Sequence, residues 1–339
     1  QYVLSRKPSE IQVPETIQGI IAARIDRLQD DLKHTMQVAS VIGKDFAYRI
    51  LQTITGMQQE LKTWLLNLQE LEFIYEKSLF PELEYMFKHA LTQEVAYNSL
   101  LLQRRKEIHE SIGKAIEELY PERLAEFYEV LAYHYSAAES WEKAYQYLKL
   151  SGDKTMRTHS RWEPFRFYRE ALEALRKLPK SEENKRRTID VRLSLIGPMM
   201  TLFWPEDSLE ILQEGERLSG ELGDAKSLAR FHGGLGLYYA GREWSKATEY
   251  LEDAFQAAEK VQDLDLMAPI GFQIGLMYFT QGDYQKVVEV APRVITLLES
   301  TQRESQFFGY PFRPYAYLVS LYGVALSAMG NFPQGQAQC

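Results

Sequence analysis

The chain has 339 residues, of which 45% are hydrophobic and 25% are charged, and its formal net charge is −8. This hydrophobic fraction can bury a core and excludes wholesale disorder, while the acidic balance argues against a general nucleic-acid-binding protein. The single cysteine, Cys339, excludes a disulfide framework and favours a reducing, cytoplasmic compartment.

The sequence offers no segment for membrane insertion. The longest nearly apolar stretch, 266–279, contains Gln273 and falls short of the roughly 20 residues that a membrane-spanning helix requires. The first residues lack the apolar core of a signal peptide. Because Gln1 is not an initiator methionine and a repeated motif breaks off near Cys339, we expect the chain to be part of a longer protein.

Helical periodicity dominates the first part of the chain. From Ile17 to Leu28, apolar residues recur every three or four positions and would share one helix face, and Pro14 and Thr16 suit the start of that helix. Gly43 suits the end of a second helix. The predicted helices are 17–28, 36–42, 46–54 and 58–71.

The apolar period then changes to two, which indicates β-strands. Residues 73–75 and 83–87 are predicted to pair as a hairpin through a turn from Ser78 to Pro81. Helices followed by one small hairpin are typical of a winged-helix domain. A long helix is predicted to follow from Ala90 to Tyr120, where Pro121 ends it.

Only helices are predicted beyond Pro121, and the breaks between them are short and contain Gly, Pro or Asp, as antiparallel helix pairs require. The charge-rich gap from Pro179 to Arg187 indicates a boundary within this region. The predicted helices are 124–138, 141–160, 163–178, 185–203, 207–221, 225–240, 244–261, 266–280, 284–299 and 313–329.

A repeat of about forty residues runs through the helical region. Small residues at fixed offsets would let paired helices approach closely, while aromatic residues would fill the groove between pairs. A further copy begins at Met329 to Phe332 and breaks off. The three fuller copies are Tyr135, Trp141, Ala144 and Leu148; Tyr238, Trp244, Ala247 and Leu251; and Tyr278, Tyr284, Val287 and Ala291. This pattern resembles the tetratricopeptide repeat (TPR), although that repeat usually has 34 residues.

These patterns predict a mainly α protein in which a winged-helix domain precedes an α-solenoid of TPR-like helical hairpins. The predicted segments are a linker over 1–13, the winged-helix domain and its long connecting helix over 14–120, a first helical-repeat segment over 121–180, and the solenoid over 181–339.

Motifs for phosphate binding and zinc catalysis fail on their spacing. A phosphate-binding loop requires Ser or Thr after Gly-Lys, but Asp45 follows Gly43-Lys44 and Ala115 follows Gly113-Lys114. His109-Glu110 lacks the second histidine of a zinc peptidase helix, because Gly113 stands in its place. We therefore expect no catalytic residue, no metal site and no cofactor within this chain.

Four glycines, at positions 233, 234, 236 and 241, miss the dinucleotide-binding fingerprint because position 239 is tyrosine. They are predicted to lie inside a helix, where they would allow close packing. The basic runs 104–106 and 185–187 are flanked by acids and are predicted to be solvated helix faces. In the segment 58–72, acidic residues outnumber the single lysine, Lys62, which disfavours DNA binding by the winged helix.

One junction has more specific chemistry. At His89 a predicted strand gives way to a predicted helix, and helix N-termini favour anions because their N–H groups are free. A histidine there could contact a phosphate or a neighbouring domain. On the residues alone, a structural role for His89 is favoured over this functional role.

Several motifs resemble those of the signal-transducing ATPases with numerous domains (the STAND class). They are Val13–Ile17, Ala23–Leu28, Ala39–Phe46, Phe87–Leu91, Glu94–Tyr97, Arg104–Arg105, Ile108–His109 and Ile112. The resemblance extends over about residues 13–180, and beyond that only the repeat character is shared. The most similar members are bacterial proteins in which a class III adenylate or guanylate cyclase domain precedes the ATPase and TPRs follow it.

The resemblance implies a role for His89. In the STAND class, the histidine at this position senses the phosphates of ADP bound to an upstream nucleotide-binding domain of the same chain. Lys88 and Ala90 replace the methionine and aspartate of the related motif, so only the histidine carries over. Lys88 would add a phosphate contact or, alternatively, be a solvated lysine. ATP or ADP with Mg²⁺ would then bind the parent protein and not this chain.

The resemblance leaves three functions open. The first is the regulatory part of a signalling ATPase linked to a nucleotide cyclase, whose repeats bind a protein or a small-molecule signal. The second is part of a STAND-class transcription regulator, and the third is a TPR scaffold without nucleotide coupling. None of them requires nucleic acid or membrane as a partner of this chain.

An aromatic connector precedes the last long predicted helix. It contains Phe307, Phe308, Tyr310, Pro311 and Phe312. Such a segment is a candidate partner-binding loop; the alternative is that it caps the preceding helix pair.

Overall fold

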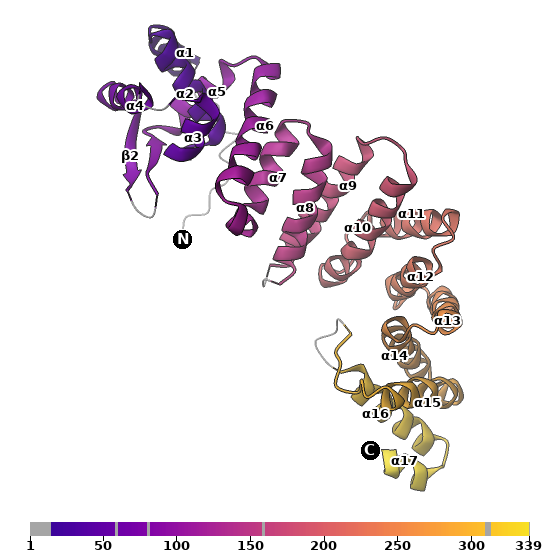
Figure 1. The fold of residues 1–339 in the computed structure, drawn as a ribbon. Coiled ribbons are helices and arrows are strands. Elements are labelled where there is room, and N and C mark those ends of the chain that lie inside the picture. Colours follow the sequence, from indigo (N-terminus) through magenta and orange to yellow (C-terminus); the bar gives the residue numbers. More distant parts are fainter. Residues whose placement is uncertain (1–14, 58–59, 80–81, 158–159, 309–312, 339) are drawn as a thin grey trace. The chain divides into compact units, whose positions relative to one another are not determined.

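The computed structural model describes residues 15–57, 60–79, 82–157, 160–308 and 313–338, which are mostly helical (Figure 1). The chain forms two compact units, Gln1–Lys154 and Thr155–Cys339. The division falls inside the segment 121–180, for which a single helical-repeat segment is predicted. The predicted linker over 1–13 lies outside the described residues.

The first unit combines helices with one small sheet. Its strands follow the order β1-β3-β2, and both pairings are antiparallel. Its elements are α1 (Glu15–Asp26), α2 (Asp30–Ile42), β1 (Asp45–Ala47), α3 (Tyr48–Thr55), α4 (Glu60–Glu70), β2 (Ile74–Ser78), β3 (Glu84–Phe87), α5 (Ala90–Asn98), α6 (Leu102–Leu119), the 3-10 helix η2 (Pro121–Glu126), α7 (Tyr128–Ala137) and α8 (Trp141–Thr155).

The predicted hairpin is present as β2 and β3, with Ile74 opposite Phe87. The predicted helix 46–54 is present as α3, but its first two residues belong to strand β1, which was not predicted. Phe46 lies in β1 with 2% of its surface exposed, and its ring packs on those of Phe87 and Tyr85 at centroid distances of 5.7 and 5.9 Å. Burial of this ring in the sheet outweighs the local helical pattern.

The prediction of a single long helix from Ala90 to Tyr120 is wrong, because the helix is interrupted between α5 and α6. The Ser99 hydroxyl donates to the Ala96 carbonyl at 2.6 Å, and Arg105 Nε donates to the Leu100 carbonyl at 2.9 Å. Side chains thus bind carbonyl oxygens at the break in place of backbone N–H groups. The helix prediction holds on either side of residues 99–101.

The second unit is an α-solenoid of TPR-like helical hairpins. Consecutive helices pack on one another, and α10, α12, α14 and α16 also contact each other in turn, so they form an inner row (Figure 1). The helices are α9 (Trp162–Arg176), α10 (Glu182–Thr201), α11 (Ser208–Glu221), α12 (Ala225–Tyr239), α13 (Trp244–Val261), α14 (Leu264–Gln281), α15 (Tyr284–Ser300), α16 (Pro314–Ala328) and α17 (Phe332–Gln338). The predicted helices of this region are confirmed, with ends that shift by a few residues.

Glycines let the helices of this unit approach closely, as predicted for Gly236, and Gly271 and Gly215 do so without having been predicted. A Cβ atom on Gly236 would lie 2.6 Å from Leu251, and one on Gly271 would lie 2.5 Å from Val294. A Cβ atom on Gly215 would overlap the fully buried ring of Phe231. Gly241 differs: it was predicted inside a helix but lies in the turn after α12 with φ +79°, which glycine adopts without strain.

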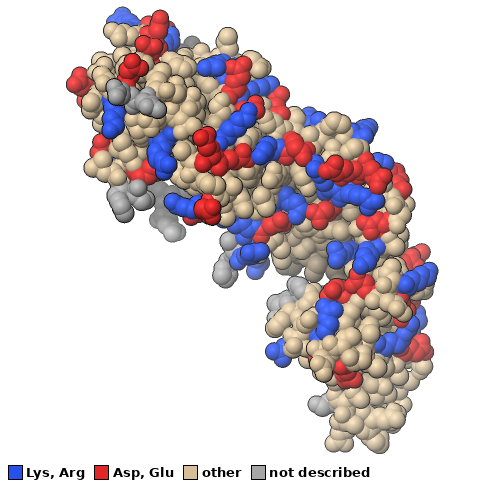
Figure 2. Space-filling view, viewed as in Figure 1, with Lys and Arg blue, Asp and Glu red and all other residues tan. Residues whose placement is uncertain are grey.

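Acidic and basic side chains alternate over the face shown in Figure 2, so no broad region of one sign forms there. The exception is the C-terminal end, because residues 314–339 contain no Lys, Arg, Asp or Glu (Figure 2). None of the described helices combines the length and apolar character needed to cross a membrane.

The close approach at Gly215 gives a stability prediction. Gly215→Ala should lower the free energy of unfolding by about 1–3 kcal/mol, because a methyl group there overpacks the Phe231 ring. Gly220→Ala is the matched control on the same helix, since a Cβ atom at Gly220 meets nothing within 4 Å. Urea unfolding of the whole chain measures both, and equal stabilities would contradict the overlap.

Candidate functional site

A groove of about 740 Å³ runs along the inner row of the second unit. Its lining residues repeat every forty positions, so one face of each inner helix contributes. Asp190, Arg230 and Ile270 occupy one repeat position on α10, α12 and α14, and Leu193, Gly233 and Gln273 occupy another. We name this cavity the inner groove.

The inner groove has an apolar floor and a charged rim. Leu193, Leu266 and Ile270 are buried or half-buried in the floor, whereas Asp190 and Arg230 are exposed at the rim. A Cβ atom on Gly233 would make only ordinary contacts, at 3.5 Å from Gln273 and 3.7 Å from Ile270. Close helix packing therefore does not require glycine at position 233, and the missing side chain deepens the groove.

One residue of the predicted partner-binding loop lines this groove. Phe308 lines it, and the Arg303 guanidinium lies 5.1 Å above the Phe308 ring. Arg303 also forms an ion pair with Asp265 of α14 at 2.5 Å. Phe307 is 49% exposed, while the predicted Tyr310 and Phe312 lie outside the described residues.

The residues predicted to pack the repeats divide by burial. Tyr135, Ala144, Ala247 and Tyr278 are buried, and Trp141, Tyr238 and Tyr284 are half-buried. Trp244 is 49% exposed and does not fill a groove between helix pairs as predicted. It begins α13, where its side chain lies beside solvent.

A polar contact recurs in two repeats and extends the predicted pattern. In the first unit, Glu117 accepts hydrogen bonds from Tyr135 at 2.9 Å and from Lys143 at 2.8 Å. In the second unit, Glu252 accepts from Tyr278 at 2.6 Å and from Lys286 at 2.8 Å.

Lysine follows tyrosine by eight residues in both contacts. Burial acts to raise the pKa of the Glu117 carboxyl, but hydrogen bonds from Lys143, Tyr147 and Tyr135 outweigh it and lower that pKa. The carboxylate of Glu117 therefore stays charged, and its hydrogen bonds link α6 to α7 and α8.

The predicted nucleotide-sensing residues lie at the junction of β3 and α5. His89 is the N-cap residue of α5; its side chain is exposed and makes no capping hydrogen bond. Lys88 forms an ion pair with Glu72 at 3.1 Å. The imidazole of His89 is thus accessible, while Lys88 already has an acidic neighbour.

A buried histidine pair in the first unit was not predicted. His109 on α6 and His134 on α7 are 0% and 1% exposed, and their Nδ1 atoms lie 2.8 Å apart. The Tyr97 hydroxyl lies 3.2 Å from Nε2 of His109. A neutral pair can share one proton between the two Nδ1 atoms, whereas a doubly protonated pair has only donors there.

The sequence gives no indication of this pair, because the two histidines are 25 residues apart and only the packing of α6 on α7 brings them together. Within the described ranges, no group of three or more His, Cys, Asp or Glu residues is arranged to hold a metal ion.

Comparison with known proteins gives structural similarity only. No protein-family model matches the sequence, and no curated protein is significantly similar to it. BtubC (BKLC) from P. vanneervenii is 15% identical with a TM-score of 0.49, over 70% of this chain and 88% of that chain. Apo RapI is 15% identical with a TM-score of 0.46, over 69% of this chain and 90% of that chain.

The STAND protein with a tetratricopeptide repeat sensor from Pyrococcus horikoshii is 13% identical with a TM-score of 0.40. The match covers 97% of this chain and 64% of that protein. Similarities at this level carry no argument about function.

The histidine pair predicts acid sensitivity. Burial lowers the pKa of both His109 and His134, and Arg105 adds to the effect on His109. Below the ordinary histidine value of 6.5, the unfolded chain therefore binds protons that the folded chain does not. The free energy of unfolding should fall by about 1.4 kcal/mol per pH unit for each histidine as the pH drops below that value.

Urea unfolding of the whole chain between pH 7 and pH 5 measures this slope. The double variant His109→Gln, His134→Gln should have a shallower slope. His89→Gln, which replaces an exposed histidine, should keep the slope of the unmodified chain. The prediction fails if the double variant also keeps that slope.

Proposed function

We propose that this chain is a regulatory, protein-binding part of a signalling protein, and that the inner groove of the second unit binds a peptide segment of the partner. The observation that supports this proposal is the groove itself: three helices present matching repeat positions around one continuous cavity. Repeat arrays bind partners through such extended inner surfaces.

The lining chemistry suits an extended peptide. Apolar side chains of the peptide would lie on the floor around Leu266 and Ile270, while Asp190 and Arg230 at the rim would bind charges of either sign. Gly197 is exposed over the groove, and a Cβ atom there would lie 3.8 Å from Met156, so the backbone of α10 is open to a ligand.

The parent protein, in this proposal, is a STAND-class ATPase with a nucleotide cyclase as its output domain. Support comes from the motif resemblance around 13–112 and from the exposed imidazole of His89 at a helix N-terminus. His89 would contact the phosphates of ADP in an upstream domain, and this chain itself would perform no catalysis. A TPR scaffold without nucleotide coupling is the alternative.

The groove is tested by selecting peptides that bind the whole chain from a random dodecapeptide library. Gly197→Leu places a side chain over the groove and should weaken the selected peptides at least tenfold. Gly220→Leu is the control, because it also adds an exposed side chain to a helical glycine but lies away from the groove. Calorimetric titration measures both affinities, and equal binding by the two variants would reject the groove.

The role of His89 is tested in the full-length parent protein. His89→Ala should speed release of ADP, because one contact to its phosphates is lost. Release of a fluorescent ADP analogue measures this rate. Lys114→Ala is the control, because Lys114 is an exposed lysine of α6 that pairs with Glu110. Unchanged release from the His89 variant would favour the scaffold.

A further inference from the structure

A second cavity of the second unit lies on a different face of α10 from the inner groove. It has a volume of about 700 Å³ and is bounded by the end of α9, the first half of α10 and α11. Thr188 and Arg192 line it, whereas Asp190 and Ser194 of the same helix line the inner groove. We name it the outer cavity.

Arg192 is the unusual residue of the outer cavity. Its side chain is 5% exposed, its Nη1 donates to the Ile211 carbonyl at 3.0 Å, and its Nε finds no acceptor. Burial lowers the pKa of the Arg192 guanidinium, and the charges of Glu214 and Glu210 only partly oppose this. A buried guanidinium in this state is costly unless an anion neutralises it.

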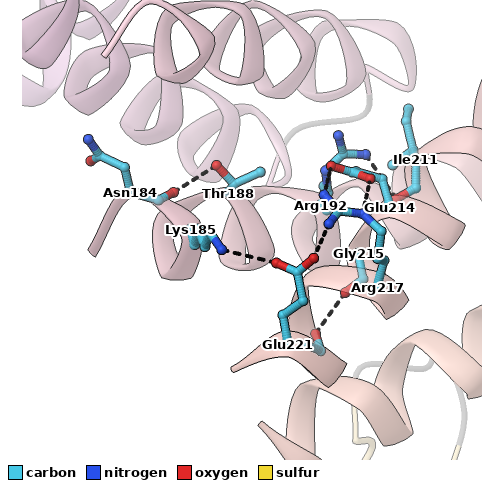
Figure 3. Close-up of polar contacts among 10 residues, drawn as sticks. Asn184, Lys185, Thr188, Arg192, Ile211, Glu214, Gly215, Arg217 and Glu221 are labelled. Atoms are coloured by element: carbon cyan, nitrogen blue, oxygen red, sulfur yellow. Dashed lines mark hydrogen bonds and ion pairs between the residues drawn. The ribbon is translucent and has the colours of Figure 1, made fainter. Parts of the chain in front are cut away.

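Two of the neighbouring carboxylates, those of Glu214 and Glu221, are already bound to other cations. Arg217 holds Glu214 with two hydrogen bonds of 2.7 and 2.9 Å. Glu221 pairs with Arg217 and, at 3.0 Å, with Lys185. Figure 3 shows these pairs beside Arg192. Among the ion pairs of the described residues, none includes Arg192, so its buried guanidinium has no carboxylate in direct contact.

The rest of the lining defines the size and polarity of a ligand. Leu172, Leu175 and Leu218 contribute an apolar wall, and Thr188 contributes a hydroxyl group. Charged residues of both signs also line the cavity, namely Glu210, Glu214, Glu221, Arg176, Lys180, Lys185 and Arg217. Arg176, Lys185 and Arg217 form ion pairs with glutamates, and Glu210 offsets the charge of Lys180, so the excess charge of the lining is that of Arg192. This balance disfavours a ligand with several negative charges. One negative charge on an apolar chain matches this lining.

From these observations we infer that the outer cavity is a binding site for a small aliphatic monocarboxylate, whose carboxylate group neutralises Arg192. This inference does not depend on the proposed function of the inner groove, because the two cavities use different faces of α10. The apolar chain of the ligand would pack on the leucine wall, and its carboxylate would form a charge-assisted hydrogen bond with the guanidinium.

Calorimetric titration of the whole chain with sodium hexanoate tests the site. Hexanoate should bind, while hexanol, which lacks the charge, and inorganic phosphate, which lacks the apolar chain, should bind at least tenfold more weakly. Phosphate binding as tight as hexanoate binding would overturn the ligand class. No binding of hexanoate would overturn the site.

Arg192→Met supplies the second test. It should weaken hexanoate binding at least tenfold and raise the Tm of the ligand-free protein, because a buried charge without an ion pair is removed. Arg186→Met is the control, since Arg186 is on the same helix but is exposed and pairs with Glu182. If hexanoate binds the two variants equally, the inference is wrong.

Thr188→Trp keeps the test decisive if Arg192→Met does not fold. It leaves Arg192 in place and fills the cavity, so it should also abolish hexanoate binding. Binding unchanged in this variant would place hexanoate elsewhere and overturn the assignment.

Discussion

The second unit depends on close contact between consecutive helices, because a single helical hairpin leaves one apolar face uncovered. Glycine residues at the contact points make this close approach possible. The Phe231 ring occupies the space above Gly215, and Val294 occupies the space above Gly271. The first contact sets the distance between α11 and α12, and the second sets the distance between α14 and α15. The inner groove is lined by helices of these pairs.

Hydrogen bonds between the helices add directional contacts to this apolar packing. Apolar contacts are not directional, whereas the hydrogen bonds that Glu252 accepts from Tyr278 and Lys286 favour one arrangement of the helices involved. Glu117 performs the same task in the first unit. The copy at Tyr238 departs from it: Lys246 pairs with Glu243, and Tyr238 meets Trp204 edge to face at 5.5 Å. The repeats thus share their packing more strictly than their polar contacts.

Helix α10 contributes to both cavities of the second unit. Its residue Asp190 faces the inner groove, while Arg192 faces the outer cavity. A helix turns by about 100° per residue, so positions two apart point to nearly opposite sides. Any shift of α10 that changes one cavity therefore changes the other.

Local patterns in the sequence predict those features that depend on neighbours along the chain. The helices, the hairpin of β2 and β3 and the forty-residue repeat all have periods that the residues display. Strand β1 has only three residues, too few to show a period, and its position depends on Phe87 of a distant strand. The break at Ser99 depends on side-chain hydrogen bonds that no hydrophobic pattern records.

The functional residues also divide into those that a local sequence pattern indicates and those that only tertiary packing brings together. His89 could be singled out because a motif surrounds it. Helix packing alone brings His109 to His134 and places Arg192 in its cavity. In the sequence, no local pattern distinguishes these residues from their neighbours. The basic run containing Lys185 was predicted to be a solvated face, which holds for the ion pair of Arg186 with Glu182 but not for the outer cavity that Lys185 lines.

The uncharged end of the chain has a consequence for how contacts there respond to salt. Dissolved ions screen attraction between charged surfaces, so contacts across the mixed charges of the remaining helices weaken as ionic strength rises. Helices α16 and α17 offer only apolar and neutral polar groups, among them Phe332 at 67% exposure. Any contact that a partner made with these helices would therefore be insensitive to screening and would be strengthened by salting-out anions such as sulfate.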